Sequence, residues 1–216
     1  MCRLAKPSSL TRLTHSRFSF SSSKKGLLEN LVVLVLDQNQ FTGTIPSTIG
    51  LLTNLIVLNL ALSRLTGSLP SELGTMKKLE HFILRRNGNL TGTIASTIGL
   101  LTNLHVVDLA GNQLTGPIPT EIGGLTLLNK LVLPHNQLSG PIPAEVWSLF
   151  LADKLAASLR PVVHELVFAE NAQLSGMVPE GVCASVGAGL LKLHFNCTEK
   201  LCGCTKCACV DAGSGN

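Results

Sequence analysis

The sequence predicts an α/β repeat solenoid: a curved, right-handed coil of short stacked units, each contributing one short strand. Apolar residues return in the same pattern every 24 or 25 residues, beginning at Leu31, Leu55, Leu79, Leu104 and Leu128. The chain has no Tyr and only 1 Trp, a composition that suits a core of repeated leucines. One unit buries too few aliphatic side chains to offset the entropy lost on ordering it, so the units must stack.

Each unit opens with a strand. Its first, fourth and sixth residues are apolar, as in Leu31, Leu34 and Leu36, and this spacing turns them toward the core. Stacked units therefore form a short-stranded parallel sheet on the concave face. At position nine, a short asparagine amide can bond backbone groups as the chain leaves the strand. We expect these residues to end the strands and tie neighbouring coils together: Asn39, Asn87, Asn112 and Asn136.

The rest of each unit is the return path on the convex face. A glycine that can take a positive φ angle precedes, in most units, Ile-Pro or Leu-Pro, as in Gly43 and Ile45-Pro46. This pattern predicts extended loops and 3-10 turns. The register breaks at an insertion over about residues 150–161. There we expect one short helix, because three leucines before Pro161 have helical spacing; they are Leu151, Leu155 and Leu159.

Two units carry the whole pattern: LIVLNLALSRLTGSLPSELGTMKK and LHVVDLAGNQLTGPIPTEIGGLTL. They resemble the plant-type leucine-rich-repeat (LRR) family, in particular the ectodomains of LRR receptor-like proteins, over roughly residues 28–195. The sequence departs from the family pattern at Ser63, which replaces the asparagine, and at Ala95, which replaces the proline. Single insertions fall near Gly88 and Ala172.

Three segments are expected along the chain. Residues 1–26 are a basic, Ser-rich leader or disordered segment. Residues 27–195 are the LRR solenoid of about six to seven repeats, with a last strand over 190–195 that turns Leu190, Leu193 and Phe195 inward. Residues 183–216 are a Cys-rich carboxyl-terminal cap and tail.

The charge and hydropathy patterns exclude two classes of partner. The net charge of +4 comes from the leader, because six of the 17 basic residues precede the first acidic residue, Glu29. The body is nearly neutral and carries no basic stripe, so we expect no nucleic-acid binding. No stretch approaches the roughly 20 consecutive apolar residues of a membrane span, so we expect no span in this chain.

The cysteines gather after the repeats, at Cys183, Cys197, Cys202, Cys204, Cys207 and Cys209. An even, clustered count at the open end of a solenoid predicts a disulfide-stapled cap. A reduced or metal-binding tail is the competing interpretation. Because the spacing lacks the second separated pair of a zinc ribbon, we expect no metal and no cofactor. N-glycosylation sequons begin at Asn89 and Asn196.

The strand pattern also predicts a binding face, since positions three, five and seven point away from the core. The candidate contacts are Val33, Val35, Val57, Asn59, His81, Ile83, Arg85, Asp108, Lys130 and Val132. An apolar patch on the first two repeats grades into a charged one. A partner would bury the valines and pair with Arg85, Asp108 or Lys130. Alternatively, β-branched residues favour strands and surface charges are simply solvated.

No Ser, His and Asp set has triad spacing, so an enzyme is not expected. The resemblance to receptor-like and secreted LRR proteins implies a non-catalytic recognition module, extracellular or associated with the cell surface, for a protein, peptide or glycan. One alternative is an intracellular or organellar structural scaffold with a reduced or metal-binding Cys tail. Another is a secreted hydrolase inhibitor resembling polygalacturonase inhibitors.

Overall fold

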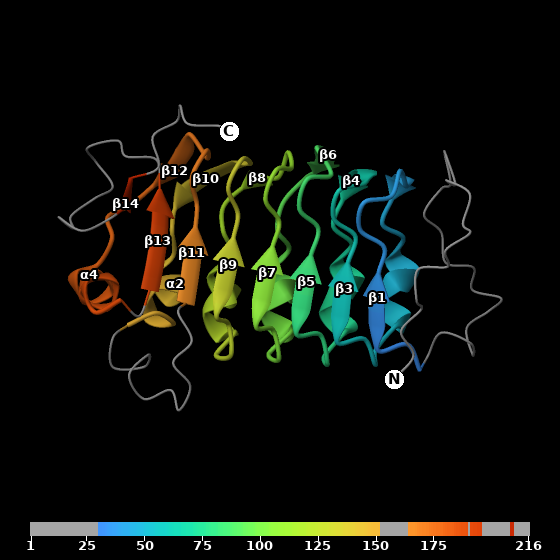
Figure 1. Cartoon of the computed structure of the whole chain (residues 1–216), viewed down its shortest axis with the longest axis horizontal. Coiled ribbons are helices and arrows are strands. Elements are labelled where there is room, and N and C mark those ends of the chain that lie inside the picture. Colours follow the sequence, from blue (N-terminus) through green and yellow to red (C-terminus); the bar gives the residue numbers. More distant parts are fainter. Residues whose placement is uncertain (1–29, 152–163, 190, 196–207, 210–216) are drawn as a thin grey trace.

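A computed structural model describes residues 30–151, 164–189, 191–195 and 208–209 of the chain. Within these ranges the strands stand in a row, each one coil further along the solenoid (Figure 1). The main sheet is parallel; it takes one strand from each of seven successive coils and one further strand after them. In order, its strands are β1 (Val33–Val35), β3 (Val57–Asn59), β5 (His81–Ile83), β7 (Val106–Asp108), β9 (Lys130–Val132), β11 (His164–Val167), β13 (Leu191–Phe195) and β14 (Ala208–Cys209).

The coils, which we number one to seven from β1 to β13, keep a single register. Leu34 pairs with Leu58 and Leu58 with Phe82, and the fourth position of each later strand continues this row to Leu193. Every side chain in the row is buried. Because a slip of one residue would turn the row outward, burial of the repeated apolar residues sets the register. The predicted inward positions are confirmed.

Short lateral strands, which the sequence analysis does not predict, pair along a second side of the coils. One lateral sheet contains β2 (Thr42–Thr44), β4 (Arg64–Ser68) and β6 (Asn89–Thr91). The other contains β8 (Thr115–Gly116), β10 (Gln137–Pro141) and β12 (Gln173–Ser175). Each of these strands contains a glycine or is directly followed by one. Gly67, in β4, has a φ of +74°. The pairing arises only because successive coils bring equivalent segments side by side.

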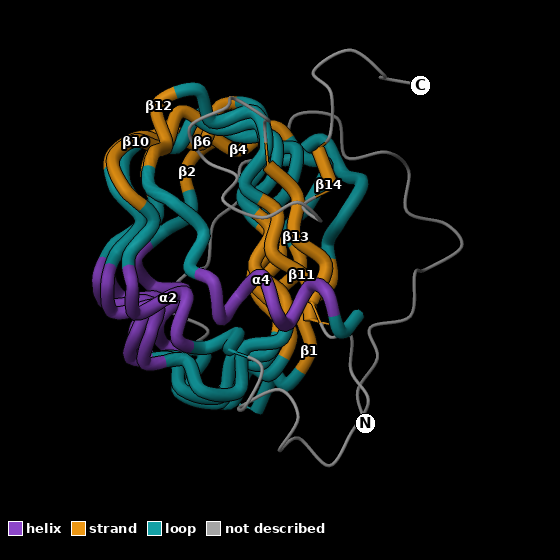
Figure 2. Tube along the Cα trace, turned by 90° about the vertical axis from the view of Figure 1, so that its left-hand side faces the viewer, coloured by secondary structure: helices purple, strands orange, loops and turns teal. Residues whose placement is uncertain are grey.

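The return path forms a column of short helices behind the main sheet (Figure 2). In the described residues four of them are 3-10 helices, as predicted: η2 (Ser47–Leu51), η3 (Ser71–Thr75), η4 (Ser96–Leu100) and η5 (Thr120–Gly124). The described residues also form two α-helices, where the sequence predicts only one, in the insertion: α2 (Ala144–Ser148) continues the column, and α4 (Glu180–Gly187) crosses the end of the solenoid (Figure 2). Apart from Leu151, which packs against the core, the leucines of that predicted helix lie outside the described residues.

The position-nine asparagines of the later coils tie neighbouring coils together as expected, whereas Asn39 of coil one is exposed and donates to Leu36 and Asp37 of its own coil. The side-chain amide of Asn87 donates to the carbonyls of Leu60, 3.1 Å away in the preceding coil, and Leu84, 2.8 Å away in its own. Its Oδ1 accepts from the backbone N–H of Leu65 at 3.2 Å. Equivalent bonds recur at Asn112, Asn136 and Asn171. At Ser63, which replaces one of these asparagines, the buried hydroxyl has no hydrogen-bond partner.

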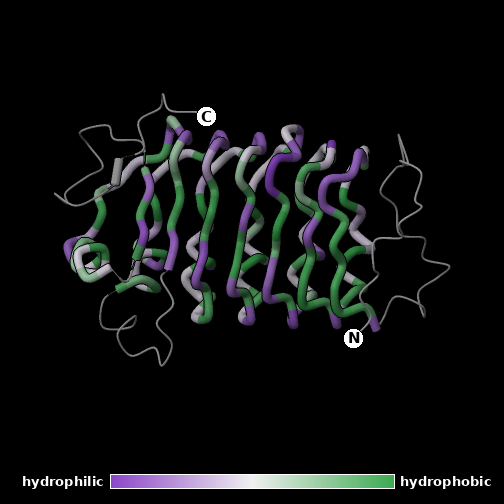
Figure 3. Tube along the Cα trace, viewed as in Figure 1, coloured by the Kyte–Doolittle hydropathy of each residue, from purple (hydrophilic) through white to green (hydrophobic). Residues whose placement is uncertain are grey.

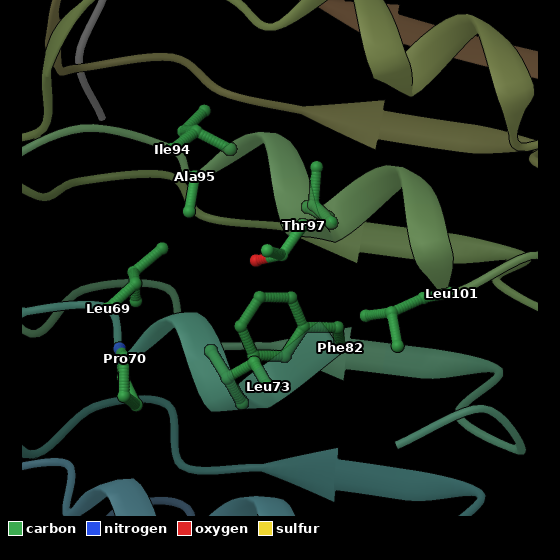
Figure 4. Close-up of a pocket in the computed structure, with 9 residues that line it drawn as sticks. Leu69, Pro70, Leu73, Phe82, Ile94, Ala95, Thr97 and Leu101 are labelled. Atoms are coloured by element: carbon green, nitrogen blue, oxygen red, sulfur yellow. The ribbon is translucent and has the colours of Figure 1, made fainter. Parts of the chain in front are cut away.

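Ala95 begins the turn that a proline begins in most other coils, and a small pocket lies beside it (Figure 4). The pocket sits between coils two and three and is almost wholly apolar; its lining includes Leu69, Pro70, Phe82 and Ile94 as well as Ala95. Ala95 keeps the conformation of its proline counterparts, with φ −68° and ψ 143°. The substitution therefore removes ring atoms without changing the path of the backbone.

Aromatic side chains close the core toward the carboxyl end. Trp147 packs edge-on against Phe168, with ring centroids 6.1 Å apart, and Phe168 stacks on Phe195 at 5.5 Å. Leu193 and Phe195 point inward as predicted, and Leu191 is buried with them; Leu190 lies outside the described residues. Among the helices that the structure describes, none has the length and hydrophobicity needed to cross a membrane.

Candidate binding face

The main sheet exposes one side to the exterior, and we call the outward side chains at positions three and five of β1 to β13 the strand face. The position-three row is Val33, Val57, His81, Val106, Lys130, Glu165 and Lys192. The position-five row is Val35, Asn59, Ile83, Asp108, Val132, Val167 and His194. Since neighbouring strands lie about 4.8 Å apart, successive members of a row are neighbours.

In the first coil, both residues of the strand face are apolar. Val35 is 49 % exposed and adjoins Asn59 of the next strand in register, while Val33 adjoins Val57. Figure 3 shows an uninterrupted hydrophobic stretch along β1, whereas the later strands mix hydrophobic and hydrophilic segments. The structure thus brings the predicted valines together on two adjacent strands.

From coil two to coil six the face has a different composition, because each strand presents one β-branched apolar residue and one polar residue. The pairs are Val57 with Asn59, Ile83 with His81, Val106 with Asp108, Val132 with Lys130, and Val167 with Glu165. An apolar residue therefore recurs beside a polar one on every strand from coil two to coil six, at position three or at position five, whereas coil seven presents Lys192 and His194.

Two ion pairs lie along the charged part of the face. The Lys130 ammonium lies 2.5 Å from the Glu165 carboxylate on the adjoining strand. Arg85, two residues after β5, places its Nε 4.0 Å from Asp108. The sequence analysis names Arg85, Asp108 and Lys130 but misses Glu165, because it maps the face only over the first five repeats. The signal that identifies it is Leu166, which restores position four and so makes Glu165 position three.

Asp108 is the buried charge of the face, with 8 % of its surface exposed. Its neighbours in register are Ile83 and Val132, and Val132 is itself only 9 % exposed. Burial raises the pKa of Asp108 above its usual value, while the hydrogen bond from Ala110 and the charges of Arg85 and Lys130 act to lower it. These two predicted contacts, Asp108 and Val132, therefore form the floor of the face and not its exposed surface.

The remaining predicted sites are placed only in part. Cys183 lies in α4, half-buried against the core, and is disulfide-bonded. Cys209 is in β14, but its side chain and the other four tail cysteines lie outside the described residues, as do Asn196 and residues 1–26. Asn89 is exposed at the start of β6. In the described part of the chain, no group of three His, Cys, Asp or Glu side chains is arranged to hold a metal.

Comparisons with known proteins agree with this architecture. The family described as Leucine Rich Repeat matches residues 30–52 and 103–125. The LRR ectodomain of the receptor kinase SOBIR1 from Arabidopsis thaliana is 30 % identical, with a TM-score of 0.56 over 65 % of this chain and 71 % of that one. No curated protein matches the chain. The chain belongs to the plant-type leucine-rich-repeat family.

Two peptide receptors are also similar to it. The plant peptide hormone receptor RGFR1, solved in complex with RGF2, is 28 % identical with a TM-score of 0.66 over 87 % of this chain. The Arabidopsis receptor kinase HAESA, solved with the peptide hormone IDA and the co-receptor SERK1, is 28 % identical with a TM-score of 0.65 over 95 % of it. This chain spans only 30 % of the RGFR1 chain and 31 % of the HAESA chain.

Proposed function

We propose that the chain is a non-catalytic recognition module that binds an extended peptide, or a peptide segment of a protein, across its strand face. The observation that carries this proposal is the series of apolar residues that begins at the valines of coil one and continues, with a polar group beside each, on every strand to coil six. RGFR1 and HAESA, similar in fold, were solved with RGF2 and with the peptide hormone IDA.

An extended peptide suits this surface better than a compact partner does, because the apolar residues are spread over successive strands and are not gathered in a single patch. Apolar burial supplies about 25 cal/mol per Å², and the exposed Val35 and half-buried Val33 and Val57 offer that area at one end. The polar groups next to the apolar residues then set orientation and register. Few interface residues carry most of the binding energy, so the most exposed valine is the one to test.

The test compares two aliphatic residues of similar exposure on opposite sides of the solenoid. Peptides that bind the full chain are first selected from a random display library. Val35→Lys, at a position 49 % exposed on the strand face, should then weaken their binding about tenfold or more. Leu51→Lys, at a position 42 % exposed in η2 on the return side, should leave it unchanged. Equal effects of the two variants, or no enriched peptide at all, would reject the proposal.

We infer an extracellular or cell-surface location for this module. The receptor ectodomains that it resembles support this inference, and so does the disulfide at Cys183, since disulfides persist mainly in oxidising compartments. Intact mass of the protein from its native source, before and after reduction with alkylation and after removal of N-glycans, tests it. Three disulfides and a glycan on Asn89 are expected. A glycan-free chain with reduced tail cysteines would favour the intracellular scaffold.

A further inference from the structure

Asp108 occupies the middle of the strand face, in the fourth of the seven coils. Ile83 flanks it on one neighbouring strand and Val132 on the other, and Val106 lies two residues before it on the same strand. Only 11 % of its side-chain surface remains exposed. The carboxylate thus lies on the floor of the face among aliphatic neighbours.

The groups that compensate this carboxylate do so incompletely. The backbone N–H of Ala110 donates to Oδ1 across 3.3 Å, a long bond for a charged acceptor. Arg85 Nε stands 4.0 Å from Oδ2, beyond hydrogen-bonding distance. The Arg85 side chain is 54 % exposed, so water screens its charge. Burying a carboxylate is costly unless it is paired and hydrogen-bonded.

The other nearby cation, Lys130, already has a partner. It lies on the next strand, 2.5 Å from the Glu165 carboxylate, and the negative charge of Glu165 acts on Asp108 in the opposite sense to that of Lys130. The two carboxylates of the strand face therefore differ: Glu165 has a close cationic partner, whereas Asp108 has only a distant and solvated one. The raised pKa of Asp108, caused first by burial, agrees with this difference.

We propose that Asp108 is the specificity-determining residue of the strand face and the anchor for a lysine or arginine side chain of the bound peptide. The inference rests on the proposed function and specifies its ligand. The aliphatic stem of such a side chain would pack on Ile83 and Val132, as long basic side chains do on apolar surface. Its charged head would reach the carboxylate and form the charge-assisted hydrogen bonds that Arg85 does not supply.

The spacing of the coils adds a sequence pattern for the ligand. Asp108 lies two strands from Val57 and three from Val35, or roughly 10 to 14 Å at the usual strand spacing. An extended peptide advances about 3.3 Å per residue. The basic residue should therefore stand about three or four residues from the apolar residues that cover coils one and two.

Peptide display tests this pattern directly. A random library is selected in parallel on the full-length wild type, on Asp108→Asn and on Glu121→Gln, with thermal melting to confirm that each is folded. Wild type should enrich peptides with a Lys or Arg about three or four residues from apolar residues. Asp108→Asn, which keeps the shape and the Ala110 hydrogen bond, should lose the basic preference. Glu121→Gln removes an exposed carboxylate of the same coil, in η5 on the return side, and should retain the preference.

A matched pair of synthetic peptides then gives the size of the effect. In the best enriched sequence the basic residue is replaced by norleucine, which keeps the apolar stem and lacks the charge. The wild type should bind the basic peptide at least about tenfold more tightly, as expected for a buried charge pair, and Asp108→Asn should bind both equally. The preference should also fade as the pH is lowered through the raised pKa of Asp108, because protonation removes the negative charge.

The failures of the two proposals are distinguishable. Enriched peptides without basic residues, or a basic preference that survives Asp108→Asn, would overturn the role of Asp108 and leave the recognition module intact. Loss of the preference in Glu121→Gln as well would assign it to the general charge of the molecule and overturn the specific assignment. Absence of any enriched peptide on the folded wild type would overturn both.

Discussion

The junctions between coils differ in how completely they keep the repeat pattern. Between coils four and five, Asn136 accepts from Leu114 N and donates to the carbonyls of Leu109 and Leu133. Between coils one and two, Ser63 leaves its hydroxyl without a hydrogen bond, and between coils two and three Ala95 borders a pocket. The strands nevertheless pair in the same register at all three junctions. The repeated apolar residues therefore specify how coils stack, while asparagine and proline stabilise a stack already specified.

The largest effect is expected from damaging the regular junction. Asn136→Ala removes a side chain that is 7 % exposed and leaves the N–H of Leu114 and the carbonyl of Leu109 without this hydrogen-bond partner. Leaving buried backbone groups unsatisfied costs about 1 to 3 kcal/mol each, so we expect a loss of roughly 3 kcal/mol in the free energy of unfolding. Urea denaturation followed by circular dichroism measures it. Ser63→Ala is the control: because its hydroxyl has no partner, it should cost almost nothing, and equal losses would contradict the comparison.

A smaller, opposite effect is expected from repairing the position-nine residue of coil two. In Ser63→Asn the new amide can reach the carbonyl of Leu60 in its own coil, as Asn87 reaches Leu84, and the carbonyl of Leu36 in the coil before it. We expect a gain of about 1 kcal/mol, the usual net value of an internal hydrogen bond, seen as a higher denaturation midpoint. Ser63→Gln, with one extra methylene, should not reproduce the gain.

The smallest effect is expected at the pocket. Ala95→Pro should stabilise the fold by about 0.5 kcal/mol, because the native φ and ψ already suit proline and the unfolded chain loses freedom. The added ring atoms also enter apolar space. Differential scanning calorimetry measures the shift in Tm, and Ala95→Gly should shift it downward. A lower Tm for Ala95→Pro would show that the pocket cannot accept the ring.

The sequence predicts the strands and the tie between coils because these depend on positions within one unit. Leu34 and Asn87 have their roles by their place in a repeat. The lateral strands escape prediction because Thr42 and Arg64 pair only after the coils have stacked. The burial of Asp108 likewise depends on Ile83 and Val132, which belong to other coils. The signal was present, since the three residues share position five, but it appears only when the units are aligned.

The one tryptophan of the chain gives the solenoid a local optical probe. Trp147 is 4 % exposed and packs against Phe168 and Phe195, so its fluorescence reports on the carboxyl-terminal coils alone. In a repeat protein each coil contacts only its neighbours, and unfolding can begin at one end and travel. A fluorescence transition that lags behind the circular dichroism transition would therefore reveal fraying from coil one, whereas coincident transitions would show the coils melting together.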